Sequence, residues 1–244
     1  MTQPIYAIGD IHGHLDKLDQ AIELIEQDGG RDAKVVCVGD YIDRGPNSKG
    51  VIDRLIQLAQ SRTLITLKGN HDRMMEWFLE TPPRHDPHMM VGMHWLHERI
   101  GGIETLASYG ISVTPMQDLL SDIHAQARRH IPQDHQAFLK NLKTSFETDD
   151  LYFCHAGIRP DVPLAEQTEN DLVWIRQEFH AHTLPHPKYI VHGHTPINFP
   201  KNYGNRLNID GGAAFGRELV PVVLDGTKKF ALTKSGRIEL GPDA

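Results

Sequence analysis

The sequence has few features that would tie it to an oxidising compartment or to a membrane. It has only two cysteines, Cys37 and Cys154, among 244 residues. Both lie in apolar runs, so we interpret them as small buried side chains of strands, and so few cysteines exclude a disulfide framework. Pro4 and Gly9-Asp10 interrupt the apolar stretch near the N-terminus, which argues against a signal peptide. No run of about 18 apolar residues occurs, so we expect no transmembrane span and a cytoplasmic protein.

An excess of positive charge is also missing. The chain has 25 Lys and Arg against 32 Asp and Glu, which gives a formal net charge of −7 at pH 7. This balance argues against a general nucleic-acid or membrane-surface binder, although it leaves room for a local basic pocket. With 39% hydrophobic and 23% charged residues, the composition is that of an ordinary globular protein. The length suits a single domain over residues 1–244 that carries an insertion.

The first part of the chain alternates between strand and helix patterns. Apolar runs at 5–10, 34–40 and 63–70 indicate buried strands, and helical spacing of apolar residues fills both intervals. A β-α-β-α-β order favours parallel pairing with right-handed crossovers. We therefore expect one edge of a sheet where the carboxyl ends of these strands meet.

Residues 72–148 lose this rhythm and show helical patterns without a convincing strand, so we predict a mainly helical insertion over the site. Asp225-Gly226 then signals a hairpin between two of the later strands. We predict an α/β protein with two packed sheets flanked by helices. The later strand patterns span residues 151–157, 188–194, 206–212, 219–226 and 229–236.

Five glycine-flanked fragments follow these strands and carry the chemistry. They are GDIHG (9–13), GDYIDRG (39–45), GNHD (69–72), HAG (155–157) and HGHT (192–195). Alone, each fragment is equally consistent with a turn or a helix cap. Five in this order, each at the end of a strand, instead indicate two divalent ions that share a carboxylate and hydrolyse phosphate esters. The candidate ligands are Asp10, His12, Asp40, Asn70, His155 and His194.

The spacing of these residues suggests how the ions are held. Asp10 and His12 are two apart in an extended segment, so they face the same side and reach one ion. Asp40, at the end of the next strand, is placed to bridge. A mixed His, Asp and Asn set suits manganese, iron or zinc better than calcium.

Further residues complete a mechanism. We expect His71 to act as a general acid that protonates the leaving oxygen, with Asp43 holding its imidazole. A water or hydroxide that bridges the two ions would attack the phosphorus. Arg44 and Arg176 are candidates to bind phosphate oxygens, with Arg159 as a third, and a surface ion pair is the alternative for each arginine.

The five fragments resemble the phosphoprotein phosphatase (PPP) family of metallophosphoesterases, whose pattern is GDxHG, GDxxDRG, GNHE, HxG and GH. The match spans residues 9–195. The resemblance implies a calcineurin-like fold, a β-sandwich flanked by helices in four αββα layers. It also implies one metal on Asp10, His12 and Asp40 and another on Asp40, Asn70, His155 and His194. The catalytic pair would be His71 and Asp43, and the phosphate-binding arginines Arg44 and Arg176.

The chain departs from that family at two places. Asp72 stands where the family usually has Glu, and we expect this residue not to touch the metals. Residues 208–217 replace the SAPNY segment of the eukaryotic members. The toxin sensitivity and substrate choice of those enzymes therefore do not transfer to this chain.

Small bacterial and phage-type protein phosphatases and bacterial diadenosine tetraphosphatases resemble the chain most. The leading hypothesis is a manganese-dependent phosphatase, with iron or zinc as alternatives, that acts on phosphorylated Ser or Thr, or Tyr, of proteins and peptides. The alternative is a dinucleoside polyphosphate hydrolase. That substrate calls for an aromatic side chain to stack on adenine, and Trp77, Trp95 and Trp174 are candidates that are equally consistent with core packing. A third hypothesis, a phosphate-binding module with an inactive centre, conflicts with the intact ligand set and His71. The substrate, the native metal and the oligomeric state stay open.

Overall fold

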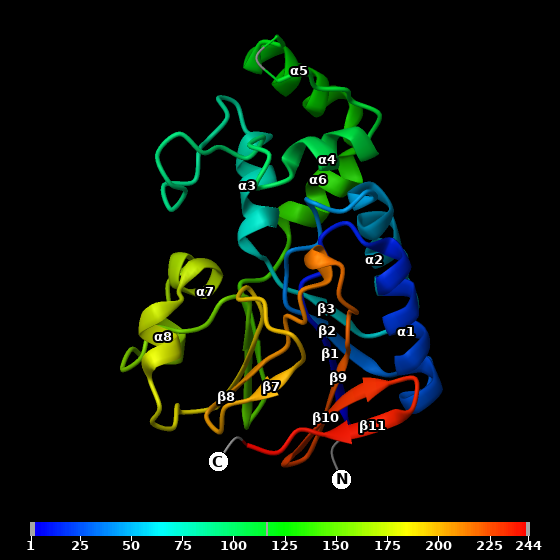
Figure 1. Cartoon of the computed structure of the whole chain (residues 1–244), viewed down its shortest axis with the longest axis vertical. Coiled ribbons are helices and arrows are strands. Elements are labelled where there is room, and N and C mark those ends of the chain that lie inside the picture. The colour runs from blue at the N-terminus through cyan, green and yellow to red at the C-terminus, as the bar shows by residue number, and fades with distance from the viewer. Residues whose placement is uncertain (1–2, 116, 243–244) are drawn as a thin grey trace.

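The computed structural model describes residues 3–115 and 117–242, and it consists of two sheets with helices on their outer faces (Figure 1). The first sheet contains, in spatial order, β11 (Gly236–Glu239), β10 (Lys228–Thr233), β9 (Val222–Asp225), β1 (Ile5–Ile8), β2 (Lys34–Cys37) and β3 (Leu64–Thr66). The second contains β4 (Ser145–Glu147), β5 (Leu151–Cys154), β6 (Tyr189–His192), β8 (Arg206–Asn208) and β7 (Lys201–Asn202).

Alternating side chains of the strands separate three apolar layers. Ile5 of β1 and Phe153 of β5 pack in one cluster between the two sheets. Tyr6 of β1 points the other way, into the cluster that includes residues of α1 (Leu15–Gly29) and α2 (Ser48–Ser61). Tyr152 of β5 packs with residues of α7 (Glu169–Trp174) and α8 (Gln177–Ala181). Because successive residues of a strand face opposite sides, this partition produces the predicted four αββα layers.

The pairing of the strands brings their carboxyl ends together. β1 pairs in parallel with β2, and β2 with β3, as the β-α-β pattern predicts. In the second sheet β6 is parallel to both β5 and β8. The hairpin predicted at Asp225-Gly226 is present between β9 and β10. Ligand sites of α/β sheets commonly form beyond the carboxyl ends of the strands.

The segment that joins β3 to β4 along the chain covers these ends. It contains α3 (Asn70–Phe78), α4 (Gly102–Ser108), α5 (Leu120–His130) and α6 (Gln133–Lys140), with an irregular stretch from 79 to 101. These helices lie beyond the upper end of the sheets in Figure 1. β4 lies inside the range 72–148 in which we expected no strand, because three residues are too few to show an alternating pattern. That the chain forms one domain with an insertion stays a prediction.

None of the helices formed by the described residues has the length and apolar character needed to cross a membrane.

Candidate metal centre

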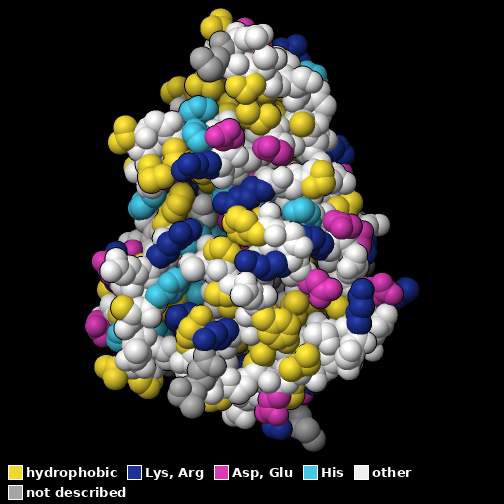
Figure 2. All heavy atoms as spheres, in the orientation of Figure 1, with side chains coloured by type: hydrophobic (Ala, Val, Ile, Leu, Met, Phe, Trp, Pro, Cys, Tyr) yellow, Lys and Arg dark blue, Asp and Glu magenta, His cyan; other side chains and the backbone are white. Residues whose placement is uncertain are grey.

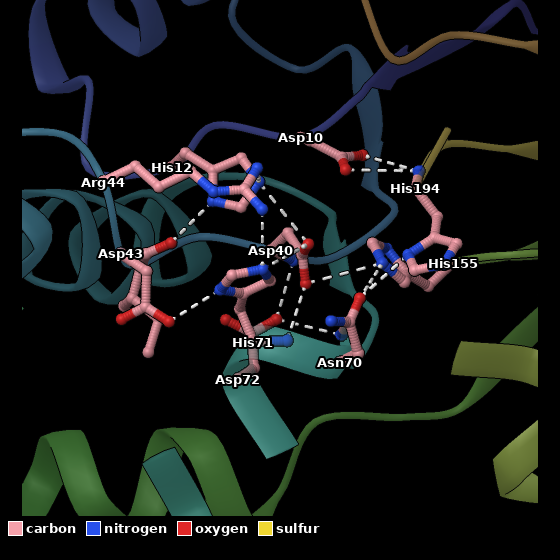
Figure 3. A network of polar contacts seen from close by, with 12 residues as sticks. Asp10, His12, Asp40, Asp43, Arg44, Asn70, His71, Asp72, His155 and His194 are labelled. Carbon is pink, nitrogen blue, oxygen red and sulfur yellow. Dashed lines mark hydrogen bonds and ion pairs between the residues drawn. The ribbon is translucent and has the colours of Figure 1, made fainter. Parts of the chain in front are cut away.

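The candidate ligands converge beyond the ends of four strands, where they are shielded from solvent (Figure 3). Asp10 and His12 follow β1, and Asp40 follows β2. Asn70 is the first residue of α3. The side chains at the ends of β5 and β6 complete the set, and all of these residues are at most 5% exposed: Asp10, His12, Asp40, Asn70, His155 and His194.

Asp40 lies between two groups of side chains. Within the described residues, two sets of three have candidate ligand atoms within 4.8 Å of one another: His12, Asp40 and His71, and Asp40, His155 and His194. His12 Nε2 is 3.5 Å from Asp40 Oδ2, whereas His155 Nε2 is 3.4 Å from Asp40 Oδ1. Each carboxylate oxygen thus faces a different set, which is the arrangement a bridging ligand needs. Burial opposes ionisation, but the imidazoles of His155 and His71 lower the pKa of Asp40 below its usual range.

The lone pairs around His155 fit a cation. His155 Nδ1 is 3.0 Å from the carbonyl oxygen of Val38, so this nitrogen carries the proton. Burial lowers the pKa of His155. Its Nε2 lone pair then faces Asn70 Oδ1 at 3.0 Å and Asp40 Oδ1 at 3.4 Å. Three acceptors without a proton between them are the donor set of a borderline divalent ion.

The same reasoning applies to the first set. His12 Nδ1 is 2.8 Å from the carbonyl oxygen of Ile42, so this nitrogen donates its proton there. Its Nε2 lone pair is directed toward Asp40 and the pocket. His12 is therefore oriented by a backbone carbonyl in the way that metal-ligating histidines are.

Asp10 lies beside the two sets without belonging to either. Both of its carboxylate oxygens are 3.2 Å from the backbone nitrogen of His194. A Cβ at Gly193 would approach Asp10 Oδ1 to 2.1 Å, so the glycine of HGHT is needed for this contact. Burial, and then the charges of Asp210 and Asp40, raise the pKa of Asp10 well above its usual value. A cation bound here would offset the repulsion between these buried carboxyl groups.

The backbone of the site is strained. Positive φ angles, a region that favours glycine, occur at five of its residues. Asp161 is the one other non-glycine residue with positive φ in the described part of the chain. The five are His12 (47°), Asp40 (55°), Asp43 (72°), Arg44 (69°) and His194 (65°).

The structure brings His71 and Asp43 into contact. His71 Nδ1 is 2.6 Å from Asp43 Oδ2, and His71 Nε2 points toward Asp40 Oδ2 at 4.0 Å. Asp43 is fully buried. Trp95 Nε1 donates to both of its oxygens, at 3.1 and 3.0 Å, and Thr105 Oγ1 donates to Oδ1 at 2.7 Å. Both donors come from the segment that joins β3 to β4, so that segment orients the pair.

Two of the three candidate arginines reach the centre. Arg44 donates from Nη1 to His12 Nε2 at 3.1 Å and from Nη2 to His71 Nε2 at 3.2 Å. Arg176 donates from Nε to His194 Nε2 at 2.9 Å. Arg159 instead pairs on the surface with Asp171, at 2.6 Å, and with Glu178, so the ion-pair alternative describes it.

Asp72 has a structural role that the sequence analysis did not recognise. It belongs to neither ligand set. Its Oδ2 accepts from the backbone nitrogens of Asp40, at 2.8 Å, and Gly69, at 2.9 Å, and its Oδ1 accepts from that of Tyr41 at 3.0 Å. Asp72 therefore fixes the loop that carries the bridging carboxylate.

Asp210 is a further residue that the sequence analysis missed. It is 4% exposed and lines the same pocket as the ligand sets. Burial raises the pKa of this carboxyl to about 6. An Asp-Gly pair directly after β8 repeats the pattern of the other fragments, and this signal could have identified it.

The three tryptophans have different surroundings. Trp95 is buried against Asp43, and Trp77 packs under the guanidinium groups of Arg73 and Arg84, at 4.5 and 3.8 Å from its ring centroid. Trp174 lines the pocket, with its ring centroid 5.8 Å from that of His194. Of the three, only Trp174 therefore lines the pocket that holds the centre.

The ligand sets open into a pocket of about 440 Å³. Asp10, Asp40 and Arg44 line its polar part. Apolar side chains such as Met90 and Phe215 line its mouth. The volume is in the range of small-molecule sites, which are roughly 300–1,000 Å³.

Comparisons with known proteins place the fold and the family. Two solved structures share the fold over 99% of this chain. One is provisionally assigned as a diadenosine tetraphosphatase, with TM-score 0.67, 19% identity and 95% of its own chain covered. The other is a cold-active protein-tyrosine phosphatase of a psychrophilic Shewanella species, with TM-score 0.66, 16% identity and 81% of its own chain covered.

Curated relatives match along most of their length. A protein of Anoxybacillus flavithermus named asymmetrical bis(5'-nucleosyl)-tetraphosphatase PrpE is 29% identical over 238 residues, covering 87% of this chain and 86% of its own. A protein of the same name from Halalkalibacterium halodurans is 25% identical over 236 residues, with coverage of 87% and 86%. Membership of the narrower phosphoprotein phosphatase family stays a prediction. The family of calcineurin-like phosphoesterases matches residues 3–220, and this chain belongs to it as a hydrolase of the metallophosphoesterase class.

Proposed function

We propose that the protein hydrolyses dinucleoside polyphosphates with two divalent ions at this centre. The similarity along 87% of the chain to relatives named bis(5'-nucleosyl)-tetraphosphatases carries the proposal. This similarity favours a dinucleoside polyphosphate, the alternative predicted from the sequence, over the phosphoprotein substrate of the leading hypothesis. The polar residues that line the pocket are compatible with either substrate, because both substrates present a phosphoryl group.

The proposal divides the six candidate ligands between two ions. Asp10, His12 and Asp40 would hold one ion, and Asp40 would share the other with Asn70, His155 and His194. Manganese is the ion we expect, with iron or zinc as alternatives. When bound, the ions supply a water of lowered pKa and neutralise charge on the phosphoryl oxygens.

The two arginines supply charge complementary to a polyphosphate. Arg44 and Arg176 direct N–H groups at imidazole nitrogens of the centre, so the same donors lie within reach of a phosphoryl oxygen there. Guanidinium groups bind phosphate in a bidentate manner. Because the chain carries a net charge of −7, this local positive charge is what draws an anionic substrate in.

His71 moves the proton. Asp43 accepts from Nδ1 and orients the ring, so that Nε2 faces the centre, where it would pass a proton to the oxygen of the departing group. A water oxygen adds to phosphorus and releases a proton to solvent, the bond between phosphorus and the bridging oxygen breaks, and His71 protonates that oxygen and then takes up a proton from solvent. One phosphoanhydride and one water thereby give two nucleotide products.

A direct test compares two substrates with the purified, manganese-loaded protein. We expect diadenosine tetraphosphate to be turned over faster than a mixed phosphoserine, phosphothreonine and phosphotyrosine peptide library, with both activities abolished by a chelator. Chromatography of the products shows which anhydride is cleaved, and AMP with ATP is the result expected from the relatives' asymmetrical name. Preference for the peptides would instead support a phosphoprotein phosphatase. Two bound metals with activity on neither substrate would favour a binding module.

A further inference from the structure

Two of the most exposed large apolar side chains lie at the mouth of the metal pocket. Met90 is 65% exposed and Phe215 is 58% exposed, and both line the cavity that contains Asp40. Figure 2 shows apolar, basic and histidine side chains next to one another across the middle of this face. Apolar surface left in water beside a polar centre marks a place where a ligand binds.

Phe215 is placed close to the phosphate-binding side of the centre. It ends the short 3-10 helix η2 (Ala213–Phe215), which follows β8 and the buried Asp210. The guanidinium carbon of Arg44 lies 5.6 Å from the centroid of its ring. The same guanidinium contacts His12 and His71. A ligand whose phosphate binds Arg44 can therefore bring an attached flat group to the exposed part of the Phe215 ring.

A loop rich in methionine provides another wall. Met89, Met90 and Met93 all line the pocket, and they are three of the seven methionines of the chain. We call residues 88–93 the methionine loop. Thioether side chains are flexible and polarisable, and they make favourable contacts with aromatic rings of varied orientation.

The methionine loop is anchored beside the centre by a buried carboxylate. Asp86 is 2% exposed and accepts from Arg73 Nη2 at 2.7 Å and from Trp174 Nε1 at 3.0 Å. Its Oδ1 accepts from the backbone nitrogen of His88 at 3.0 Å. The start of the loop is thus tied to α3 and α7, so the loop is positioned although its methionine side chains remain adaptable.

We propose that Phe215 and the methionine loop form a subsite for a purine base, which stacks on Phe215 while the adjoining phosphate binds Arg44. This inference deepens the proposed function and rests on it for the class of ligand. A flat ring and unbranched thioethers offer contacts to a flat aromatic base. A peptide would also bring backbone N–H and C=O groups that need partners, and Met90, Met93 and Phe215 offer none through their side chains.

The experiment isolates the contribution of the base. Calorimetry measures the binding of adenosine 5'-monophosphate and of ribose 5-phosphate to the manganese-loaded protein. We expect the nucleotide to bind about tenfold more tightly, because stacking of a base on an aromatic side chain has an effect of this order. In Phe215→Ala the ratio should fall close to one. Because the ratio compares two ligands on one protein, a general change of phosphate or metal affinity cancels.

Matched variants locate the effect. Phe199 is also exposed, at 39%, and does not line the pocket, so Phe199→Ala should keep the ratio of the unmodified protein. A Met90→Ser, Met93→Ser double variant should lower the ratio in part. A base-dependent ratio that survives both the Phe215 and the methionine substitutions would overturn the placement of the subsite.

Other outcomes separate this inference from the proposed function. Equal affinity for the two ligands in the unmodified protein would refute the base subsite, even if diadenosine tetraphosphate is hydrolysed. A base-dependent ratio that Phe215→Ala abolishes, without hydrolysis of the dinucleotide, would uphold the subsite and refute the proposed function. A gain for a phosphoserine peptide over phosphate that Phe215→Ala abolishes, with none for the base, would show a peptide site and overturn the inference.

Discussion

The two halves of the centre are held in different ways. On the His71 side, Asp43 is oriented by the side chains of Trp95 and Thr105, which come from the segment that joins β3 to β4. On the His155 side, the imidazole donates to the backbone carbonyl of Val38 at the end of a strand. The half that we expect to move a proton thus depends on side chains of the segment that joins β3 to β4, whereas His155 is oriented by the backbone of the first sheet.

Loss of the residue shared by both halves should have the largest effect. In Asp40→Asn the negative charge is lost, and one of the two oxygens that face the ligand sets becomes an NH2 group that cannot bind a metal. We expect turnover to fall by more than about 10⁴-fold, beyond the loss of an acid–base group alone. Elemental analysis should find fewer than two metals per chain. A folded Asp40→Asn protein that still holds two metals would show that Asp40 does not bridge.

Loss of the proposed acid should affect one half and spare the other. His71→Asn should lower kcat by about 10²- to 10⁴-fold, the usual contribution of general acid catalysis. Metal content should stay at that of the unmodified protein, because His71 is not among the ligands proposed for either ion. The loss should be larger for substrates with poor leaving groups. Full turnover on a poor leaving group would disprove the role of His71 as the acid.

A smaller change tests whether Trp95 orients the pair of Asp43 and His71. Trp95→Phe removes the donor to Asp43 but keeps a ring to pack against Phe78, 4.8 Å away between centroids. We expect a fall in kcat of about tenfold with metals retained, and a stability cost of about 1.5–3 kcal/mol for a hydrogen bond to a charged group. Trp77→Phe is the control, since Trp77 packs against arginines away from Asp43. If both variants shift the pH profile of kcat alike, the Trp95 contact does not orient the pair.

Two half-buried histidines beside the second sheet should make the fold sensitive to acid. Burial lowers the pKa of both His180 and His186 to about 4, and both rings pack around Phe179 behind the second sheet. The folded pKa is below the ordinary value, so the unfolded chain takes up protons first. Stability should therefore be lost as pH falls from about 6.5 toward 4.

The measurement is the unfolding temperature of the metal-free protein between pH 7 and 5. It should fall less in a His180→Gln, His186→Gln double variant than in the unmodified protein. An equal fall would assign the acid sensitivity to other groups.

Patterns with a local physical cause were predictable from the sequence. The strands β1 and β2 and the hairpin at Asp225-Gly226 follow from apolar runs and turn chemistry, and the glycine-flanked ligands follow from the chemistry of metal binding. β4 was missed because it has three residues, and β11 because its four exposed residues form no apolar run. The pairing of Trp95 with Asp43 joins residues 52 positions apart and depends on tertiary packing, which no spacing reveals.

The left-handed residues of the centre have a consequence for selection. Each non-glycine residue held at positive φ costs of the order of 1–3 kcal/mol, and five of them surround one site. Their sum is comparable with the whole folding stability of a typical domain, roughly 5–15 kcal/mol. Glycine at positions such as Asp43 or Arg44 would relieve the backbone while removing the side chain that acts. A laboratory evolution that rewarded heat resistance alone would therefore tend to enrich inactive chains.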